Sequence, residues 1–352
     1  MFVHLECHSH YSFLRGVNAP EEIIAAAAEQ KMPAVALTDT NGMYAALPFY
    51  QAARKAEVKP ILGVVLDVER QVTNGEWRVA GSGREIPRLR ADENHRPSAR
   101  DDSKNIGGRV IPLVLLAMDA DGYSNLCQLT TLRHLGALRL GQETFAENAS
   151  RAVTLEELAT YSAGVLALWP ASALLRMELA GRGAACCAPT KAPVPQNHPG
   201  REERASEGGR YTNLREIFGD RLYIAVQHLS PGDGRILREA EQLGREMNIP
   251  LVATNNVHFL RPEEHLHHRA VNAIRTGSLL TTVAPPEITT GEAWFKPAVE
   301  MQRLFPDHPQ LLRATLEIAE RCNLKLELGK LIFPEFRAAG RIALLLFVEA
   351  QF

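Results

Sequence analysis

Short apolar runs alternate with longer amphipathic segments along the first 260 residues, a pattern typical of strands followed by helices. The apolar runs have the length and the Val, Ile, Leu and Ala content of buried strands. Because strand and helix alternate, we expect parallel βαβ units, and we predict that seven such strands form an α/β fold, a distorted seven-stranded β/α barrel. The strands are expected over about 3–8, 34–39, 60–68, 110–117, 164–169, 222–226 and 250–254.

Two stretches interrupt this alternation and divide the chain. Residues 70–109 and 181–210 are polar, biased in composition and without an apolar helical stripe. Segments that cannot bury enough apolar surface stay solvated, so we expect two insertions without a fixed fold, with nucleic-acid contact as an alternative for the first. The predicted domains are a barrel over 1–260, extra C-terminal helices over 261–336 that pack outside the barrel, and an atypical tail over 337–352.

Composition narrows the class of protein. The chain has 352 residues, 45% of them hydrophobic, and a formal net charge of -2, so a large core is possible and bulk charge does not favour nucleic-acid binding. Five cysteines form no CxxC pair, which favours reduced thiols over a disulfide framework. No apolar run has membrane-spanning length and no signal peptide opens the chain, so we expect a cytoplasmic protein without a membrane partner.

Side chains that bind metals follow the first predicted strand at alternate positions, Glu6, His8 and His10. Alternate residues of a strand share a face, and the chemistry of β/α barrels lies at the carboxyl ends of the strands. The last predicted strand is followed in the same way by Asn256 and His258. The pattern therefore predicts a metal site at one mouth of the barrel. No GxGxxG, P-loop or GxSxG pattern supports a nucleotide or serine-hydrolase site.

Short motifs lie, in this order along the chain, at 8–16, 37–44, 59–63, 117–126 and 253–259. Together they resemble the polymerase-and-histidinol-phosphatase (PHP) domain that opens bacterial DNA polymerase III alpha subunits. Trp294, Phe295 and Lys296 resemble the segment before the polymerase palm, which separates the chain from free-standing PHP phosphatases. Cys7 and the run that begins at Ser12 lean towards the error-prone branch.

The resemblance also implies where metal ions would bind. In metal-binding members, residues at successive strand ends hold two or three ions; the corresponding positions here are Glu6, His8, Arg15, Thr40, Val65, Pro112, Ala171, Asn256 and His258. Only His8 and His258 keep the family's ligand type, and Glu6 replaces a histidine. The resemblance thus implies a degraded site with no catalytic residue and no expected cofactor, in which Glu6, His8 and His258 are vestigial ligands for a single residual zinc or manganese ion.

The end of the chain departs from the family as well. Residues 331–336 resemble the junction into the polymerase core, and the tail after them does not resemble that core. The palm that binds magnesium and nucleotide is expected to be missing, so the chain alone is predicted to be inactive as a DNA-directed DNA polymerase, a nucleotidyltransferase. A truncated or frameshifted gene is the preferred explanation.

Three functions stay open. The first is a structural PHP domain of a polymerase III alpha subunit, in replication or error-prone repair, with the polymerase core and other replicase subunits as partners and DNA bound only by the full-length enzyme. The second is a metal-dependent phosphoesterase or 3′–5′ exonuclease that uses Glu6, His8 and His258. The third is a free-standing binding module. Glu264 and His268 lie one turn apart on a predicted helix, where they could hold a metal ion or belong to a solvated helix face.

Overall fold

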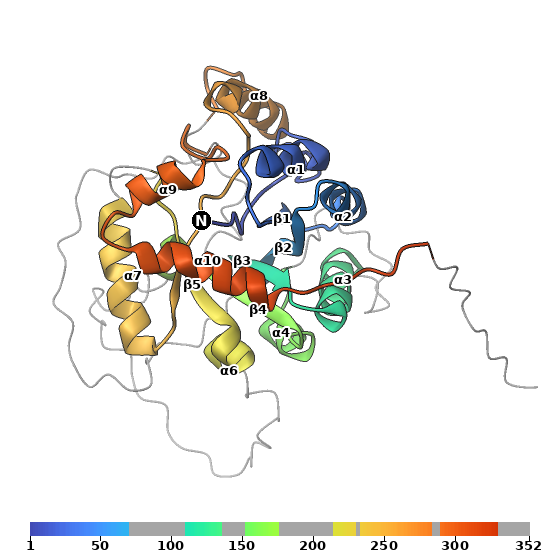
Figure 1. Ribbon diagram of the computed structural model, residues 1–352, viewed down its shortest axis with the longest axis vertical. Helices are drawn as coiled ribbons and strands as arrows, with labels where there is room; N and C mark the ends of the chain where they lie inside the picture. The colour runs from blue at the N-terminus through green and yellow to red at the C-terminus, as the bar shows by residue number, and fades with distance from the viewer. Residues whose placement is uncertain (70–109, 136–151, 176–213, 230–232, 284–288, 330–352) are drawn as a thin grey trace, which may run out of the picture.

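The computed structural model describes residues 1–69, 110–135, 152–175, 214–229, 233–283 and 289–329 (Figure 1). Both predicted insertions and the predicted tail lie outside these residues. A curled sheet of six strands forms the centre of the described chain, and its spatial order follows the sequence. The strands are β1 (Ala34–Thr40), β2 (Lys59–Glu69), β3 (Val110–Ala117), β4 (Val165–Pro170), β5 (Leu222–Val226) and β6 (Leu251–Ala253). The mixed α/β class and the barrel-like sheet agree with the sequence-based expectation.

The expected parallel order holds for every neighbouring pair except those of β3. This strand runs antiparallel to both β2 and β4, whereas β1 with β2, β4 with β5 and β5 with β6 are parallel. A parallel neighbour needs a crossover connection, and the long segment between β2 and β3 carries no helical pattern, so a reversed strand is the simpler connection. Pro112, near the start of β3, therefore lies opposite Asp67 at the carboxyl end of β2.

The seventh predicted strand, at residues 3–8, is an extended segment and not a member of the sheet. It is hydrogen-bonded on both sides: Thr38 N donates to Cys7 O on the β1 side (2.8 Å), and His8 N donates to Val257 O on the other (2.8 Å). Cys7 and Val257 form an isolated parallel bridge. The segment thus joins the β1 edge of the sheet to the chain that follows β6. Only six of the seven predicted strands are regular, because this segment makes too few evenly spaced bonds with either neighbour.

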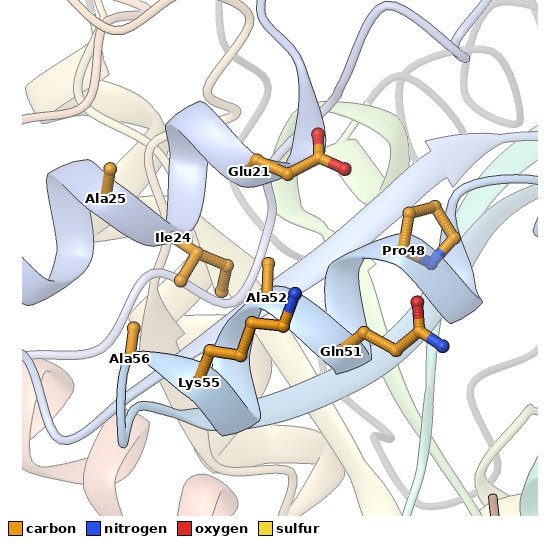
Figure 2. A pocket seen from close by; sticks show the side chains of 8 residues that line it. All are labelled: Glu21, Ile24, Ala25, Pro48, Gln51, Ala52, Lys55 and Ala56. Atoms are coloured by element: carbon orange, nitrogen blue, oxygen red, sulfur yellow. The ribbon is translucent and has the colours of Figure 1, made fainter. Parts of the chain in front are cut away.

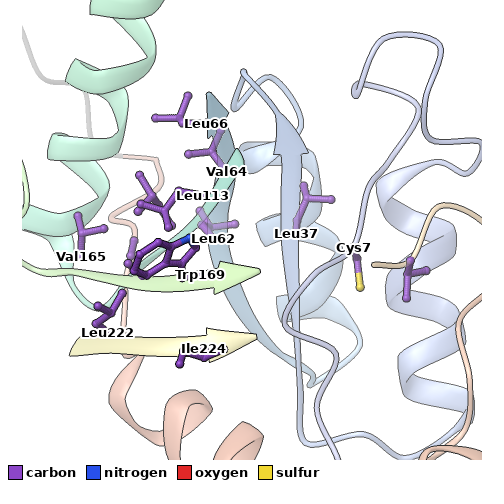
Figure 3. Packing of buried hydrophobic residues seen from close by; sticks show 14 of the residues in the cluster. Cys7, Leu37, Leu62, Val64, Leu66, Leu113, Val165, Trp169, Leu222 and Ile224 are labelled. Atoms are coloured by element: carbon purple, nitrogen blue, oxygen red, sulfur yellow. The ribbon is translucent and has the colours of Figure 1, made fainter. Parts of the chain in front are cut away.

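Helices cover the outer face of the sheet. Apolar side chains alternate along each strand, as the period of a strand requires, and the outward set packs against the helices. Figure 3 shows part of this outer core, with Trp169 of β4 lying among Leu113, Val165 and their neighbours. The covering helices are α1 (Pro20–Glu29), α2 (Ala46–Lys55), α3 (Ala120–Leu135), α4 (Leu155–Thr160), α6 (Leu214–Phe218) and α7 (Asp233–Met247). No helix of the described residues is long and apolar enough to cross a membrane.

Three further helices follow β6: α8 (His265–Thr276), α9 (Ala298–Leu304) and α10 (Pro309–Arg321). The expected helical segment is therefore present as far as the described residues reach. However, α10 does not pack outside the barrel. Figure 1 shows it running across the sheet, and its side chains join those of the inner face in a second apolar cluster. That cluster combines Ala314, Ile318, Ala319 and Cys322 of α10 with residues such as Val3, Ala36, Val114, Leu168 and Val252.

Hydrogen bonds fix α10 at the end of the sheet where β2 begins. Lys59, the first residue of β2, donates through Nζ to Ala319 O (2.6 Å) and Asn323 Oδ1 (2.8 Å). In the middle of the helix, Thr315 Oγ1 accepts from the backbone N–H of Val3 (3.1 Å). The helix therefore covers the apolar inner face and leaves the opposite end, where β1 and β2 terminate, to the candidate site.

We predict that Ile318→Ala lowers the free energy of unfolding by about 3 kcal/mol, because it opens a cavity in a cluster that cannot easily collapse. Ile318 is fully buried, whereas Glu317 beside it is exposed. Urea unfolding of Ile318→Ala and of Glu317→Ala measures the effect. Equal, small changes in both variants would contradict the inner position of α10.

A second prediction concerns His4, which is buried between Phe2 and Phe295 and donates through Nε2 to Lys296 O (2.8 Å). Burial lowers the pKa of His4 from 6.5 to about 4. A depressed pKa in the folded state means that the stability gained from the neutral ring is complete above pH 6.5 and is lost as pH falls towards 4. The difference in unfolding free energy between wild type and His4→Gln should thus shrink by at most about 1.4 kcal/mol per pH unit in that window. A pH-independent difference in urea titrations would contradict it.

Candidate functional site

The turn that follows the extended segment is held by a buried carboxylate. Asp39, near the end of β1, accepts three hydrogen bonds: from the backbone N–H of Ser9 (2.7 Å), from the hydroxyl of Ser9 (2.8 Å) and from the hydroxyl of Ser12 (2.6 Å). Burial raises the pKa of Asp39, and these hydrogen bonds act in the opposite direction. Asp39 therefore fixes the backbone of the turn over the carboxyl end of β1.

Two candidate ligands meet at this mouth of the barrel. The rings of His8 and His258 are stacked, with centroids 4.3 Å apart and an interplanar angle of 7°. His8 Nδ1 lies 3.1 Å from Ser12 Oγ. Because the Ser12 hydroxyl donates to Asp39, its oxygen is the acceptor here, which assigns the proton to His8 Nδ1. The structure therefore brings together two of the three candidate ligands predicted from the sequence.

A third histidine reaches the same place from α8. The carbonyl oxygen of Arg15 lies 3.3 Å from His258 Nδ1 and 2.8 Å from His268 Nδ1. A carbonyl oxygen can only accept a hydrogen bond, so Nδ1 carries the proton in both the His258 ring and the His268 ring. His268 is 1% exposed, and its ring centroid lies 5.1 Å from that of His258. The expectation of a solvated helix face is therefore wrong at His268, although it holds for the exposed His267.

The three imidazoles are held in the neutral form. Burial is the largest cause in each case, and the positive charge of Arg15 adds to it. Together these effects lower the pKa of His8 to about 3 and that of His268 to about 4, and they lower the pKa of His258 well below its ordinary value. At neutral pH the rings therefore act as hydrogen-bonding groups without charge.

Glu6, the third candidate ligand, is engaged elsewhere. Its Oε2 accepts from Gln227 Nε2 (2.9 Å), and burial raises the pKa of the carboxyl group. Thr40 Oγ1 lies 3.4 Å from His8 Nδ1 and supports that ring. Among the described residues, no group of three or more His, Cys, Asp or Glu side chains is arranged to hold a metal ion. The residues at the mouth thus do not fit a multinuclear metal site.

Two features of the site were not expected from the sequence. Asp39 stands near the end of a predicted strand, and the two serines that follow the extended segment are suitable donors for it. Glu264, the other member of the alternative metal pair with His268, accepts through Oε2 from the backbone N–H of Leu260 (2.9 Å). His268 and Asn272 lie one turn apart on α8, and their burial is decided by tertiary contacts that the sequence does not signal.

A pocket of about 400 Å³ lies elsewhere, between α1 and α2 (Figure 2). It contains none of the candidate ligands. Its floor is made of small apolar side chains, and Glu21 and Lys55 are its charged members. The lining residues are Glu21, Ile24, Ala25, Pro48, Gln51, Ala52, Lys55 and Ala56.

The arrangement can now be compared with known proteins. Residues 4–228, more than half of the chain, match the model of the PHP domain. The chain belongs to the PHP family. The DNA polymerase III subunit alpha of Pseudomonas aeruginosa is 30% identical over 336 residues, which cover 95% of this chain and 24% of that protein. The error-prone DNA polymerase of Anaeromyxobacter sp. is 26% identical over 93% of this chain and 23% of its own length. This PHP chain thus spans about a quarter of the length of the curated relatives it matches.

Solved structures are more distant. An amidohydrolase from Chromobacterium violaceum, with bound sulfate and no metal, aligns at a TM-score of 0.35 and 14% identity, over 73% of this chain and 88% of that one. A likeness at this distance says nothing about chemistry.

We predict that Asp39→Asn destabilises the PHP chain by about 2 kcal/mol, because the amide leaves at least one of the three donors without an acceptor. The matched control is Asp121→Asn, at an exposed acid in the first turn of α3. Urea unfolding gives the free energy, and limited proteolysis of residues 9–16 reports the turn. An Asp39 variant as stable as the Asp121 variant would contradict this role.

Proposed function

We propose that the chain acts as a structural PHP domain of a DNA polymerase III alpha-type polymerase. The observation that carries the proposal is the alignment with alpha subunits along 95% of the chain, combined with a mouth that is short of metal ligands. In this role the domain supports the remainder of the polymerase and does not itself hydrolyse a phosphodiester.

The chemistry of the mouth supports this role. A hydrolytic metal site needs several ligands, an open position for water and access for the substrate. Here Glu6, His8 and His258 are 5%, 4% and 6% exposed. Val65 and Ala171 offer no donor side chain, and the Arg15 side chain brings a positive charge where the family implies a ligand. Ligands this few and this buried are poorly suited to activate water against a phosphodiester.

The partners that follow from this role are the polymerase core and other replicase subunits, in replication or in error-prone repair. DNA is bound by the assembled polymerase. Within the chain, we propose that the structural unit is the predicted 1–260 barrel extended through α10, because α10 covers the inner face of the sheet.

A single residual zinc or manganese ion at Glu6, His8 and His258, with phosphoesterase or 3′–5′ exonuclease activity, is the opposing prediction. An assay of phosphodiester hydrolysis distinguishes it from the structural role. Hydrolysis of bis(p-nitrophenyl) phosphate and of 3′-labelled single-stranded DNA, with zinc or manganese added, should not exceed the level of His8→Ala. Metal-dependent cleavage that is lost in His8→Ala and kept in His10→Ala would overturn the structural role, since His10 is exposed.

We predict that a chimaera in which this chain replaces the matching first quarter of the Pseudomonas aeruginosa alpha subunit stays soluble and extends a primer. The reason is that a structural domain has to provide a folded surface and no catalytic group. Ile318→Asp within the chimaera, which places a charge in the inner cluster, is the control expected to abolish soluble expression. A soluble chimaera that cannot extend a primer would contradict the proposal.

A further inference from the structure

The Arg15 carbonyl gathers imidazoles from two separate parts of the chain. His258 follows β6 and His268 lies on α8, and both come after residue 228, where the match to the PHP family model ends. Both approach the same oxygen through Nδ1, at 3.3 Å and 2.8 Å. We call Arg15, His258 and His268 the imidazole clamp.

Hydrogen bonding leaves no nitrogen of His268 for a metal. The backbone N–H of Thr289 points to His268 Nε2 (3.2 Å), and Thr289 Oγ1 lies 3.0 Å from the same atom. An N–H can only donate, so Nε2 is the acceptor and the ring proton is on Nδ1, which donates to Arg15. Both ring nitrogens are thus used, one towards the turn and one towards the chain after α8.

The stacked pair cannot share one ion either. The lone pair of an imidazole nitrogen lies in the plane of the ring, so an ion bound to two rings has to lie in both planes, at about 2.0–2.1 Å from each nitrogen for zinc. The planes of His8 and His258 are 7° from parallel in a face-to-face stack at 4.3 Å. Two nearly parallel, separated planes do not meet at that distance.

The third candidate ligand is engaged as well. Glu6, the candidate carboxylate, is hydrogen-bonded to Gln227.

We infer that the mouth of this PHP domain is closed without metal: the imidazole clamp fastens α8 to the N-terminal turn through neutral hydrogen bonds, where a metal cluster would otherwise join the strand ends. His268 is in this sense a positioning residue. His268 also contacts Thr289, and the chain a few residues further on is bonded to the residues after β6, where Asn255 Nδ2 donates to Trp294 O (2.7 Å). The inference concerns the closure of the mouth and holds whether or not the domain supports a polymerase.

The first test is metal binding by the whole chain. The purified protein is dialysed against zinc alone or manganese alone, and its metal content and thermal unfolding are measured with and without EDTA. A structural metal ion couples its binding free energy to folding, so its removal would lower the unfolding temperature. We expect substoichiometric metal and no shift with EDTA. One tightly held ion per chain, with a lower unfolding temperature in EDTA and loss of the ion in His8→Ala, would overturn the inference.

The second test measures the clamp by hydrogen exchange. His268→Ala should speed amide exchange in α8 and in residues 9–16 roughly tenfold, because both segments lose the hydrogen bond that joins them. His267→Ala, at the exposed neighbour on the same helix, should exchange as wild type does. His268→Asn, whose amide can replace the Nδ1 proton, should restore part of the protection. Faster exchange confined to α8 would contradict the link between α8 and the turn. If His268→Ala does not fold, the metal measurement on the wild-type protein decides whether the mouth is closed without metal.

Discussion

The apolar inner face of the curled sheet is the constraint on which the rest of the fold depends. A strand buried on both faces needs a cover on each, and helices from the first two thirds of the chain supply only the outer one. α10 supplies the other, with small and branched residues one turn apart, Ala314 and Ile318, that fit the narrow space. Because the helix occupies one end of the sheet, polar chemistry is confined to the opposite end, where the strands that run parallel terminate.

At that end, the polar groups are satisfied by one another. A buried carboxylate or imidazole without partners costs several kcal/mol, so the buried side chains at the mouth need hydrogen-bond partners. Asp39 accepts hydrogen bonds from the serines of the turn, and Glu6 accepts one from Gln227. His258 and His268 both donate to the backbone carbonyl oxygen of Arg15. The result is a mouth in which two buried acids and the imidazoles are held by hydrogen bonds to nearby groups.

Local pattern predicted much of this, and the remainder depended on tertiary contacts. The strands from β1 to β6 and the helices α2, α7 and α10 follow from apolar periodicity, and His8 and His258 follow from their places after strands. The reversal of β3 could not be read from periodicity, since a fully buried strand has the same composition in either direction. His268 was misjudged because its burial is decided by Arg15 and Thr289, which are distant in sequence. The depth of α10 was missed because an amphipathic helix does not tell which apolar surface it will cover.

The extended segment at residues 3–8 has a consequence for the order in which the molecule can assemble. Its partners are β1, the chain beside Val257 and the hydroxyl of Thr315, which lies 312 residues away from Val3 in sequence. Residues 3–8 are synthesised long before α10, the last described helix, and the backbone N–H of Val3 has to wait for Thr315 of that helix as its acceptor. Contacts this distant in sequence slow folding and prolong the time during which apolar strands are exposed. The chain is therefore most prone to aggregation, and most dependent on chaperones, before α10 is synthesised and covers the inner face of the sheet.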